Sequence, residues 1–194
     1  MKLKKDFYIR NNVLEIAKDL IGKVLVTHVD GIFTAGVITE TEGYDGIRDR
    51  ACHAFNGRRT PRTEIMYSEG GIAYIYLCYG IHALFNVVTN EKDTPDAVLI
   101  RAVSPVDGVE QMLRRRNKLK ADKTLAGGPG TVSQSLGLRL NLNGTKLTGK
   151  NIWIEDRSIY IPENEIKITK RIGVEGAGEA AHYPYRFVIK NDYF

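Results

Sequence analysis

Apolar residues recur at helical spacing close to the start of the chain. The residues that set this spacing are Val13, Ile16, Ala17 and Leu20. Asn11 or Asn12 can accept hydrogen bonds from the first free backbone amides, and Gly22 stops the pattern. The sequence therefore predicts a short amphipathic helix that packs one face against a core.

Strand-like patterns dominate the positions that follow. Two apolar runs, 24–29 and 32–38, flank Asp30-Gly31, and an Asp-Gly dipeptide between two such runs is a strong signal for a β-hairpin. The second run continues into Glu40-Thr41-Glu42-Gly43-Tyr44. We therefore expect one long strand after the first turn.

Strands outnumber helices in the rest of the chain. The remaining predicted elements are strands 72–78 and 82–89 as a hairpin around Tyr79-Gly80, a strand over 97–103, helices over 106–119 and 131–138, and strands near 152–154, 165–168 and 186–189. Positions 45–70 are polar and predict a long loop, and such a loop in a compact domain is commonly functional. Hairpins imply antiparallel pairing, so we expect an α+β fold: a single domain over 1–194 with a curved, mostly antiparallel sheet and a protruding β-hairpin.

The composition is that of an ordinary globular domain with a basic excess. Lys plus Arg is 28 and Asp plus Glu is 23, which gives a net charge of +5. This excess suits a polyanion such as nucleic acid, although many proteins without such a partner carry as much charge. No apolar run approaches the roughly 18 residues that span a bilayer, and no secretory signal is visible. We expect a monomeric, cytoplasmic protein with reduced cysteines that stays away from membranes.

Two carboxylates and three tyrosines are the first candidates for chemistry. Glu40 and Glu42 lie two positions apart on a strand, so both point to one face. They are either solvated on an exposed edge or directed into a cleft. Tyr74 and Tyr76 share a strand face, as an aromatic stripe over the core would, whereas Tyr79 falls at a hairpin tip that its own sheet buries poorly.

Basic residues gather in the long polar loop. They are Arg48, Arg50, Arg58, Arg59 and Arg62. Arg suits bidentate contacts with phosphate better than Lys does. Gly127-Gly128-Pro129-Gly130 precedes a predicted helix, where free backbone amides can hold an anion. The four histidines show no metal-ligand spacing and no nucleotide-binding glycine motif occurs, so we expect neither a metal nor a cofactor.

Several short motifs follow one another in order along the chain, and together they are far more specific than any one of them. They are Glu40-Thr41-Glu42-Gly43-Tyr44, Ala51-Cys52-His53, Arg59-Thr60-Pro61-Arg62, Tyr74-Ile75-Tyr76-Leu77-Cys78-Tyr79-Gly80, Asn86, Leu99-Ile100-Arg101-Ala102, Gly128-Pro129-Gly130, Arg171-Ile172-Gly173-Val174 and Pro184-Tyr185-Arg186-Phe187. With them the chain resembles the alkyladenine (3-methyladenine) DNA glycosylases, bacterial members included. The resemblance extends from about residue 13 to 190.

The resemblance implies roles in catalysis and DNA binding. Glu42 would activate the attacking water, with Arg101 and the backbone carbonyl near Val174 helping to hold it. Tyr79 would wedge into the minor groove and fill the space that an extruded base leaves. The expected DNA contacts of the basic loop are Arg58, Arg59 and Arg62.

The resemblance also implies a base-binding pocket. Tyr44 would stack on one face of the flipped base, with His53 and Tyr76 on the other. Asn86 would line the pocket floor and help to reject undamaged guanine. Aromatic faces accept many bases, and cationic ones best, which would give broad specificity.

The expected reaction is hydrolysis. An N-glycosidic bond breaks through an oxocarbenium-like sugar, which a nearby carboxylate can stabilise while it activates water. None of the matched pocket positions is Lys, so no amine is available for a lyase step. We therefore predict a monofunctional DNA glycosylase of base excision repair, acting on alkylated or deaminated purines flipped out of double-stranded DNA. Two alternatives stay open: a non-enzymatic nucleic-acid binder, and a carbohydrate hydrolase that uses Glu40 and Glu42.

Overall fold

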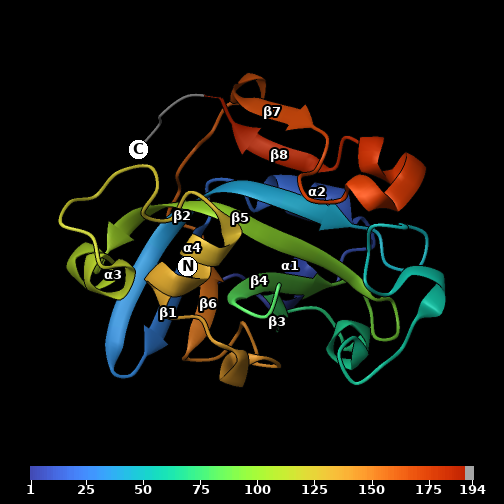
Figure 1. Cartoon of the computed structure of the whole chain (residues 1–194), viewed down its shortest axis with the longest axis horizontal. Coiled ribbons are helices and arrows are strands. Elements are labelled where there is room, and N and C mark those ends of the chain that lie inside the picture. Colours follow the sequence, from blue (N-terminus) through green and yellow to red (C-terminus); the bar gives the residue numbers. More distant parts are fainter. Residues whose placement is uncertain (191–194) are drawn as a thin grey trace.

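The fold is built on a sheet in which every strand pairing within the described residues, 1–190, is antiparallel. The computed structural model contains β1 (Val24–Val29), β2 (Ile32–Tyr44), β3 (Ile72–Cys78), β4 (His82–Thr89), β5 (Asp96–Asp107), β6 (Ile152–Glu155), β7 (Ile166–Thr169) and β8 (Arg186–Ile189). The strand order is β3-β4-β5-β2-β1-β6, and β8 pairs with both β2 and β7. This arrangement confirms the predicted α+β fold class (Figure 1). Positions 191–194 of the predicted domain lie outside the described residues.

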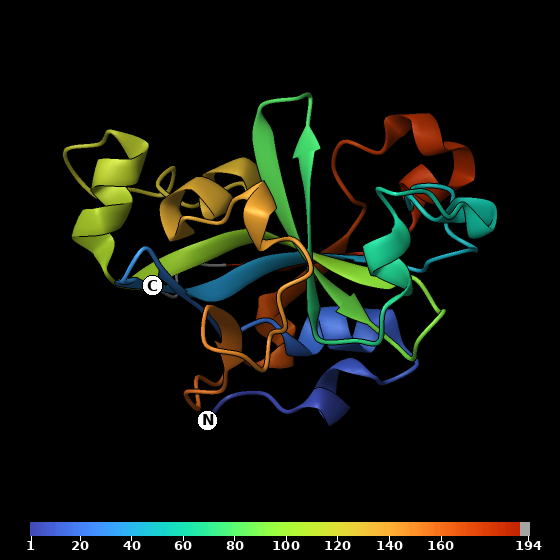
Figure 2. The same ribbon diagram turned by 90° about the horizontal axis from the view of Figure 1, so that it is seen from below.

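Helices lie on both sides of the central strands. The α-helices are α1 (Lys5–Tyr8), α2 (Val13–Asp19), α3 (Val109–Arg116) and α4 (Pro129–Leu136). Short 3₁₀-helices are η1 (Phe55–Gly57), η2 (Glu64–Tyr67), η3 (Leu140–Leu142), η4 (Glu163–Glu165) and η5 (Glu175–His182). Figure 2 shows α2 on one side of β2 and β5 and α4 on the other, with the β3–β4 hairpin projecting beside α4. None of the helices in residues 1–190 has the length and apolar character needed to cross a membrane.

The first helix and the first hairpin form as their local signals predict. Asn12 Oδ1 accepts hydrogen bonds from the Leu14 and Glu15 amides at 3.1 and 3.3 Å, so it caps α2. Asp30 and Gly31 have φ angles of 54° and 75°. Positive φ at both central residues is the mark of the type I′ turn that matches the twist of a hairpin.

The predicted helices 106–119 and 131–138 are wrong at their ends. Strand β5 runs on to Asp107, which pairs with Ala35 of β2, so Val106 belongs to the sheet. Gly108, with φ of 69°, turns the chain where a Cβ would lie 2.3 Å from the Phe33 carbonyl oxygen. The helix α3 therefore starts only at Val109. Strand and helix share an apolar pattern here, which periodicity alone does not divide.

The second of these helices, α4, is displaced by two residues toward the N-terminus. It begins at Pro129, whose missing amide hydrogen is no loss in the first helical position. It ends at Leu136 because Gly137 takes a left-handed conformation with φ of 71°. The predicted glycine-rich break thus supplies both the N-cap and the first turn of α4.

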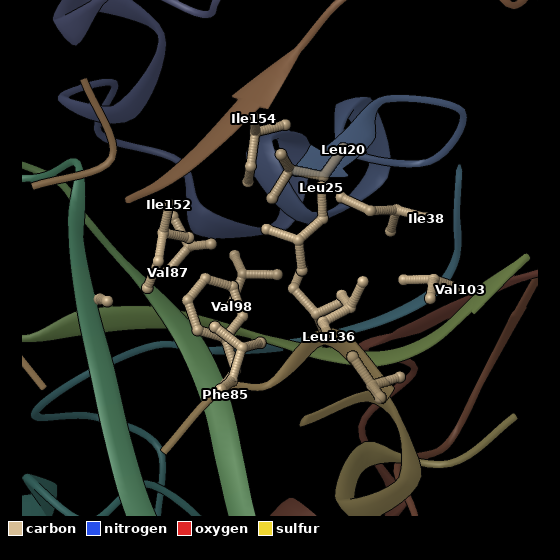
Figure 3. Packing of buried hydrophobic residues seen from close by; sticks show 14 of the residues in the cluster. Leu20, Leu25, Ile38, Phe85, Val87, Val98, Val103, Leu136, Ile152 and Ile154 are labelled. Carbon is tan, nitrogen blue, oxygen red and sulfur yellow. The ribbon is translucent and has the colours of Figure 1, made fainter. Parts of the chain in front are cut away.

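The main core joins the sheet to the helices on both sides. Figure 3 shows Leu20, next to α2, and Leu136 of α4 in one cluster with Leu25, Val98 and Phe85 of the sheet. A smaller aromatic-rich cluster lies under the long loop and consists of Cys52, Ala54, Met66, Tyr67, Tyr74, Val88 and Ala97. This second cluster fixes the loop over one end of β3, β4 and β5, where the candidate site forms.

Candidate active site

Strand register brings the candidate residues to one face of the sheet. Glu42 of β2 pairs with Leu99 of β5, Leu99 pairs with Asn86 of β4, and Asn86 pairs with Tyr74 of β3. Directly paired residues of neighbouring antiparallel strands share a face. Tyr44 lies two positions beyond Glu42 and shares that face. This wall of the candidate site is therefore formed by four strands, of which β2 is separated from β3, β4 and β5 by the long loop.

A cavity of about 100 Å³ opens beside this row. Its lining residues are Tyr44, Ala51, Cys52, His53, Met66, Tyr74, Tyr76, Asn86, Ala97, Gly173 and Val174. The four residues expected to form the base pocket, Tyr44, His53, Tyr76 and Asn86, are all among them, and so is Val174, whose carbonyl is expected to help hold the attacking water. For comparison, an enclosed apolar cavity of about 150 Å³ binds a benzene molecule.

Glu42 is fully buried next to the cavity. Its Oε1 accepts a hydrogen bond from the Ile172 amide and its Oε2 accepts one from the Tyr44 hydroxyl, both at 2.8 Å. Arg101 Nε lies 3.4 Å from Oε1. Burial raises the pKa of Glu42 above its usual value, while the Arg101 charge opposes that rise. A carboxylate with a raised pKa is a better proton acceptor at neutral pH, as a general base requires.

Glu40 is committed to other partners. Its Oε1 accepts hydrogen bonds from Arg101 Nε at 2.7 Å and from Arg186 Nε at 2.6 Å. Two register shifts flank Glu40 and leave Arg101 without a partner on β2, so its guanidinium reaches both carboxylates. Glu40 and Glu42 therefore share one cation, as expected for side chains on one face. A carbohydrate hydrolase needs two independent carboxyl groups flanking its substrate, which this arrangement does not provide.

His53 presents a neutral ring to the cavity. Burial, together with the nearby Arg62 and Arg58 charges, lowers the pKa of His53 to about 4. Its ring meets the Tyr76 ring edge to face with centroids 4.7 Å apart, and its Nδ1 lies 3.0 Å from the Tyr74 hydroxyl. A neutral imidazole can contact a cationic base without charge repulsion.

Asn86 forms a rigid part of the cavity wall. It is 4% exposed, and its Nδ2 donates hydrogen bonds to the Tyr74 carbonyl at 3.2 Å and to the Leu84 carbonyl at 3.4 Å. These bonds use both donors of the amide and fix its orientation.

Tyr79 projects from the tip of the β3–β4 hairpin. It is 90% exposed, and the neighbouring Ile81 is 72% exposed. Tyr79 and Gly80 both have positive φ, 51° and 74°, and the Ile81 amide donates to the Cys78 carbonyl across the turn. Tyr79 is therefore not a core residue, whereas Tyr74, which is 2% exposed, lies in the core as an aromatic stripe would. The sequence pattern does not single out Ile81 as a second exposed apolar residue of the tip, although it directly follows the Tyr79-Gly80 turn.

The three loop arginines expected to contact DNA differ in their surroundings. Arg59 binds Glu64 and Asp93 and lies over the Tyr67 ring. Arg62 lies 4.9 Å above the Tyr76 ring, beside the cavity. Arg58 follows η1 and is exposed. In residues 1–190, no three His, Cys, Asp or Glu side chains come together as metal ligands would.

Comparison with known proteins identifies the family. The family model described as "Methylpurine-DNA glycosylase (MPG)" matches residues 6–193. Proteins named "Putative 3-methyladenine DNA glycosylase" from Chlamydia abortus, Bacillus thuringiensis and Clostridium acetobutylicum are 47%, 44% and 42% identical to the chain. The alignments cover 96%, 100% and 99% of this chain and 97%, 98% and 96% of those proteins. The chain therefore belongs to the methylpurine-DNA glycosylase family and is a DNA N-glycosylase.

Proposed function

We propose that this chain hydrolyses the bond between the sugar and a methylated or deaminated purine that has been flipped out of double-stranded DNA. The observation that carries this proposal is the pairing of a buried carboxylate, Glu42, with a cavity walled by aromatic rings. A base inside a duplex is out of reach of such a cavity, so it must leave the stack. The whole of 1–194 serves as one glycosylase domain and acts as a monomer.

The base stacks between Tyr44 on one side and His53 with Tyr76 on the other. Glu42 takes a proton from a water molecule, with Arg101 and the carbonyl of Val174 helping to hold that water. The water oxygen bonds to C1′ as the C1′–N bond breaks, and the bonding electrons go to the base. A methylated purine that carries a positive charge leaves as a neutral base, whereas a neutral purine needs a proton.

The proposed reaction stops at the abasic site. A lyase would need an amine nucleophile, and no lysine lines the cavity within residues 1–190. Cys52 does line it, but burial raises the pKa of that thiol to about 12, so it stays protonated and unreactive. We therefore expect free base and an intact strand carrying an abasic site.

The test is base release from matched duplexes that contain N3-methyladenine, N7-methylguanine, hypoxanthine or no lesion. The chain should release methylated bases and leave the strand uncut until alkali is added. Strand cleavage without alkali would show a lyase and refute the monofunctional mechanism. Binding with no release from any duplex would instead favour a nucleic-acid binder without activity.

A further inference from the structure

A buried ion pair lies directly behind the cavity. Arg171 is 3% exposed and Asp49 is 2% exposed. Arg171 Nη2 donates to Asp49 Oδ1 at 2.9 Å, and Nη1 donates to the other oxygen of the same carboxylate. The guanidinium also donates to the carbonyls of Gly43 at 2.9 Å and Ala180 at 3.1 Å. Neither member of the pair lines the cavity.

The pair joins three parts of the site. The Arg171 guanidinium carbon lies 4.7 Å from the centre of the Tyr44 ring, and the next residue, Ile172, donates its amide to Glu42. Asp49 accepts from the Ala51 amide at 2.9 Å, two positions before His53. Since Tyr44 lines the cavity and Arg171 does not, the guanidinium contacts the Tyr44 ring from outside the cavity.

This geometry has an electrostatic consequence. A cation stacked on the cavity side of Tyr44 would lie roughly 8 Å from the Arg171 guanidinium, since a ring contact adds about 3.5 Å. At an effective dielectric constant of about 20, an uncompensated charge at that distance would weaken binding of a cation on the order of tenfold or more. The Asp49 carboxylate, which binds the guanidinium through both oxygens, opposes that field. Stability alone does not account for the pair, because apolar residues of similar size serve a core equally well.

We propose that Arg171 and Asp49 are positioning residues, which hold Tyr44, Ile172 and the part of the long loop that carries His53 in fixed positions relative to one another. Asp49 also keeps the face of the Tyr44 ring able to accept a cationic base. This inference rests on the proposed function. It assigns the preference for cationic over neutral purines in part to a carboxylate that touches no substrate.

The test compares single-turnover release of N7-methylguanine, which is cationic in DNA, with release of hypoxanthine, which is neutral. Asp49→Asn keeps the shape of the side chain but removes the negative charge of the carboxylate that pairs with Arg171. It should slow release of the cationic base about tenfold more than release of the neutral one. The double variant Asp49→Asn/Arg171→Met removes both charges. It should slow both bases alike and return their ratio to that of the parental chain.

The exposed pair Arg157–Asp107, 2.7 Å apart and remote from the cavity, supplies the matched control. Asp107→Asn should change neither rate. Equal slowing of both bases by Asp49→Asn, or an unaltered rate for both in the double variant, would overturn the inference.

If Asp49→Asn does not fold, the double variant decides the positioning role. If the parental chain does not release hypoxanthine, binding of the two duplexes in the Glu42→Gln background replaces the rates. A parental chain that releases no base would instead refute the proposed function itself.

Discussion

At the scale of single residues, the site is a set of buried groups whose protonation depends on their neighbours. Glu42 must be ionised to accept a proton from water. Burial raises its pKa and the Arg101 charge opposes the rise, so in the proposed mechanism the balance between the two sets the acidic limit of activity. The pKa of His53 is about 4, so its ring stays neutral even at pH values well below 6.5, the usual pKa of a histidine.

The first prediction follows from this balance. Arg101→Gln removes the charge that stabilises the ionised form of Glu42, so the pKa of Glu42 should rise further. Activity that depends on the carboxylate is present above that pKa and is lost as the pH falls through it. The acidic limb of the single-turnover rate should therefore move to higher pH. The pH–rate profiles of the two proteins provide the measurement, and no limb should appear near 6.5 from His53.

Arg186→Gln is the matched control because the Arg186 guanidinium binds Glu40 and, within the described residues, forms no ion pair with Glu42. Its acidic limb should stay close to that of the parental chain. An equal shift in both variants would mean that general loss of positive charge, rather than Arg101, sets the limb. No shift in Arg101→Gln would remove Glu42 as the titrating group.

At the scale of elements, the β3–β4 hairpin is the feature that its own residues determine most fully. Its strands occupy Ile72–Cys78 and His82–Thr89, as the alternating pattern and the Tyr-Gly turn predict. A tyrosine with positive φ is uncommon, because its Cβ crowds the following carbonyl. The turn accepts that strain while the ring of Tyr79 buries little area in the free protein. Such strain at an exposed tip agrees with a role in binding.

The second prediction concerns this tip. Tyr79→Ser should change the free energy of unfolding by less than about 0.5 kcal/mol, because the side chain is exposed. It should slow release of a base-paired lesion roughly tenfold more than release from a single strand, which has no stack to hold open. Thermal melts and rates on the two substrates measure both effects.

Tyr160→Ser is the corresponding control, since Tyr160 is 81% exposed but lies outside the hairpin. It should leave both rates unchanged. A wedge is ruled out if Tyr79→Ser slows the two substrates equally, and a large drop in melting temperature would make Tyr79 structural.

At the scale of the whole molecule, the net charge of +5 is expected to attract DNA, but individual arginines differ in how far acidic neighbours neutralise them. Arg59 is neutralised by Glu64 and Asp93, whereas Arg58 forms no such ion pair among the described residues. The third prediction is that Arg58→Gln lowers the slope of log affinity against log salt by about 1, as loss of one phosphate contact would. Arg59→Gln should lower it less. Affinity for undamaged duplex at several salt concentrations gives the slopes, and a slope near zero in the parental chain would contradict electrostatic binding of DNA.

The sequence predicts the local features of this molecule well and the distant contacts poorly. The Asn12 cap, the Asp30-Gly31 turn and the tip position of Tyr79 depend on neighbouring residues, and all three form as predicted. The bond from the Ile172 amide to Glu42 joins residues 130 apart, and the bonds from Arg171 to Asp49 join residues 122 apart. No local pattern encodes such pairs, because they arise only when the segment between β7 and η5 packs against β2 and the long loop. The resemblance implies which residues form the pocket, but strand register brings Tyr44, Tyr76 and Asn86 to one face of the sheet, and packing of distant loops adds His53 and Val174.

The most direct test of the account is single-turnover release of a methylated purine by the Glu42→Gln variant, measured beside its affinity for the same duplex. The substitution keeps the shape of the side chain, and the new amide oxygen can still accept from the Ile172 amide. The variant should therefore fold like the parental chain, and its affinity for DNA should stay within a few-fold of the parental value. Without a carboxylate to accept the proton, release should fall by about 100-fold or more. Release at the parental rate by Glu42→Gln would contradict the central claim that Glu42 activates the attacking water.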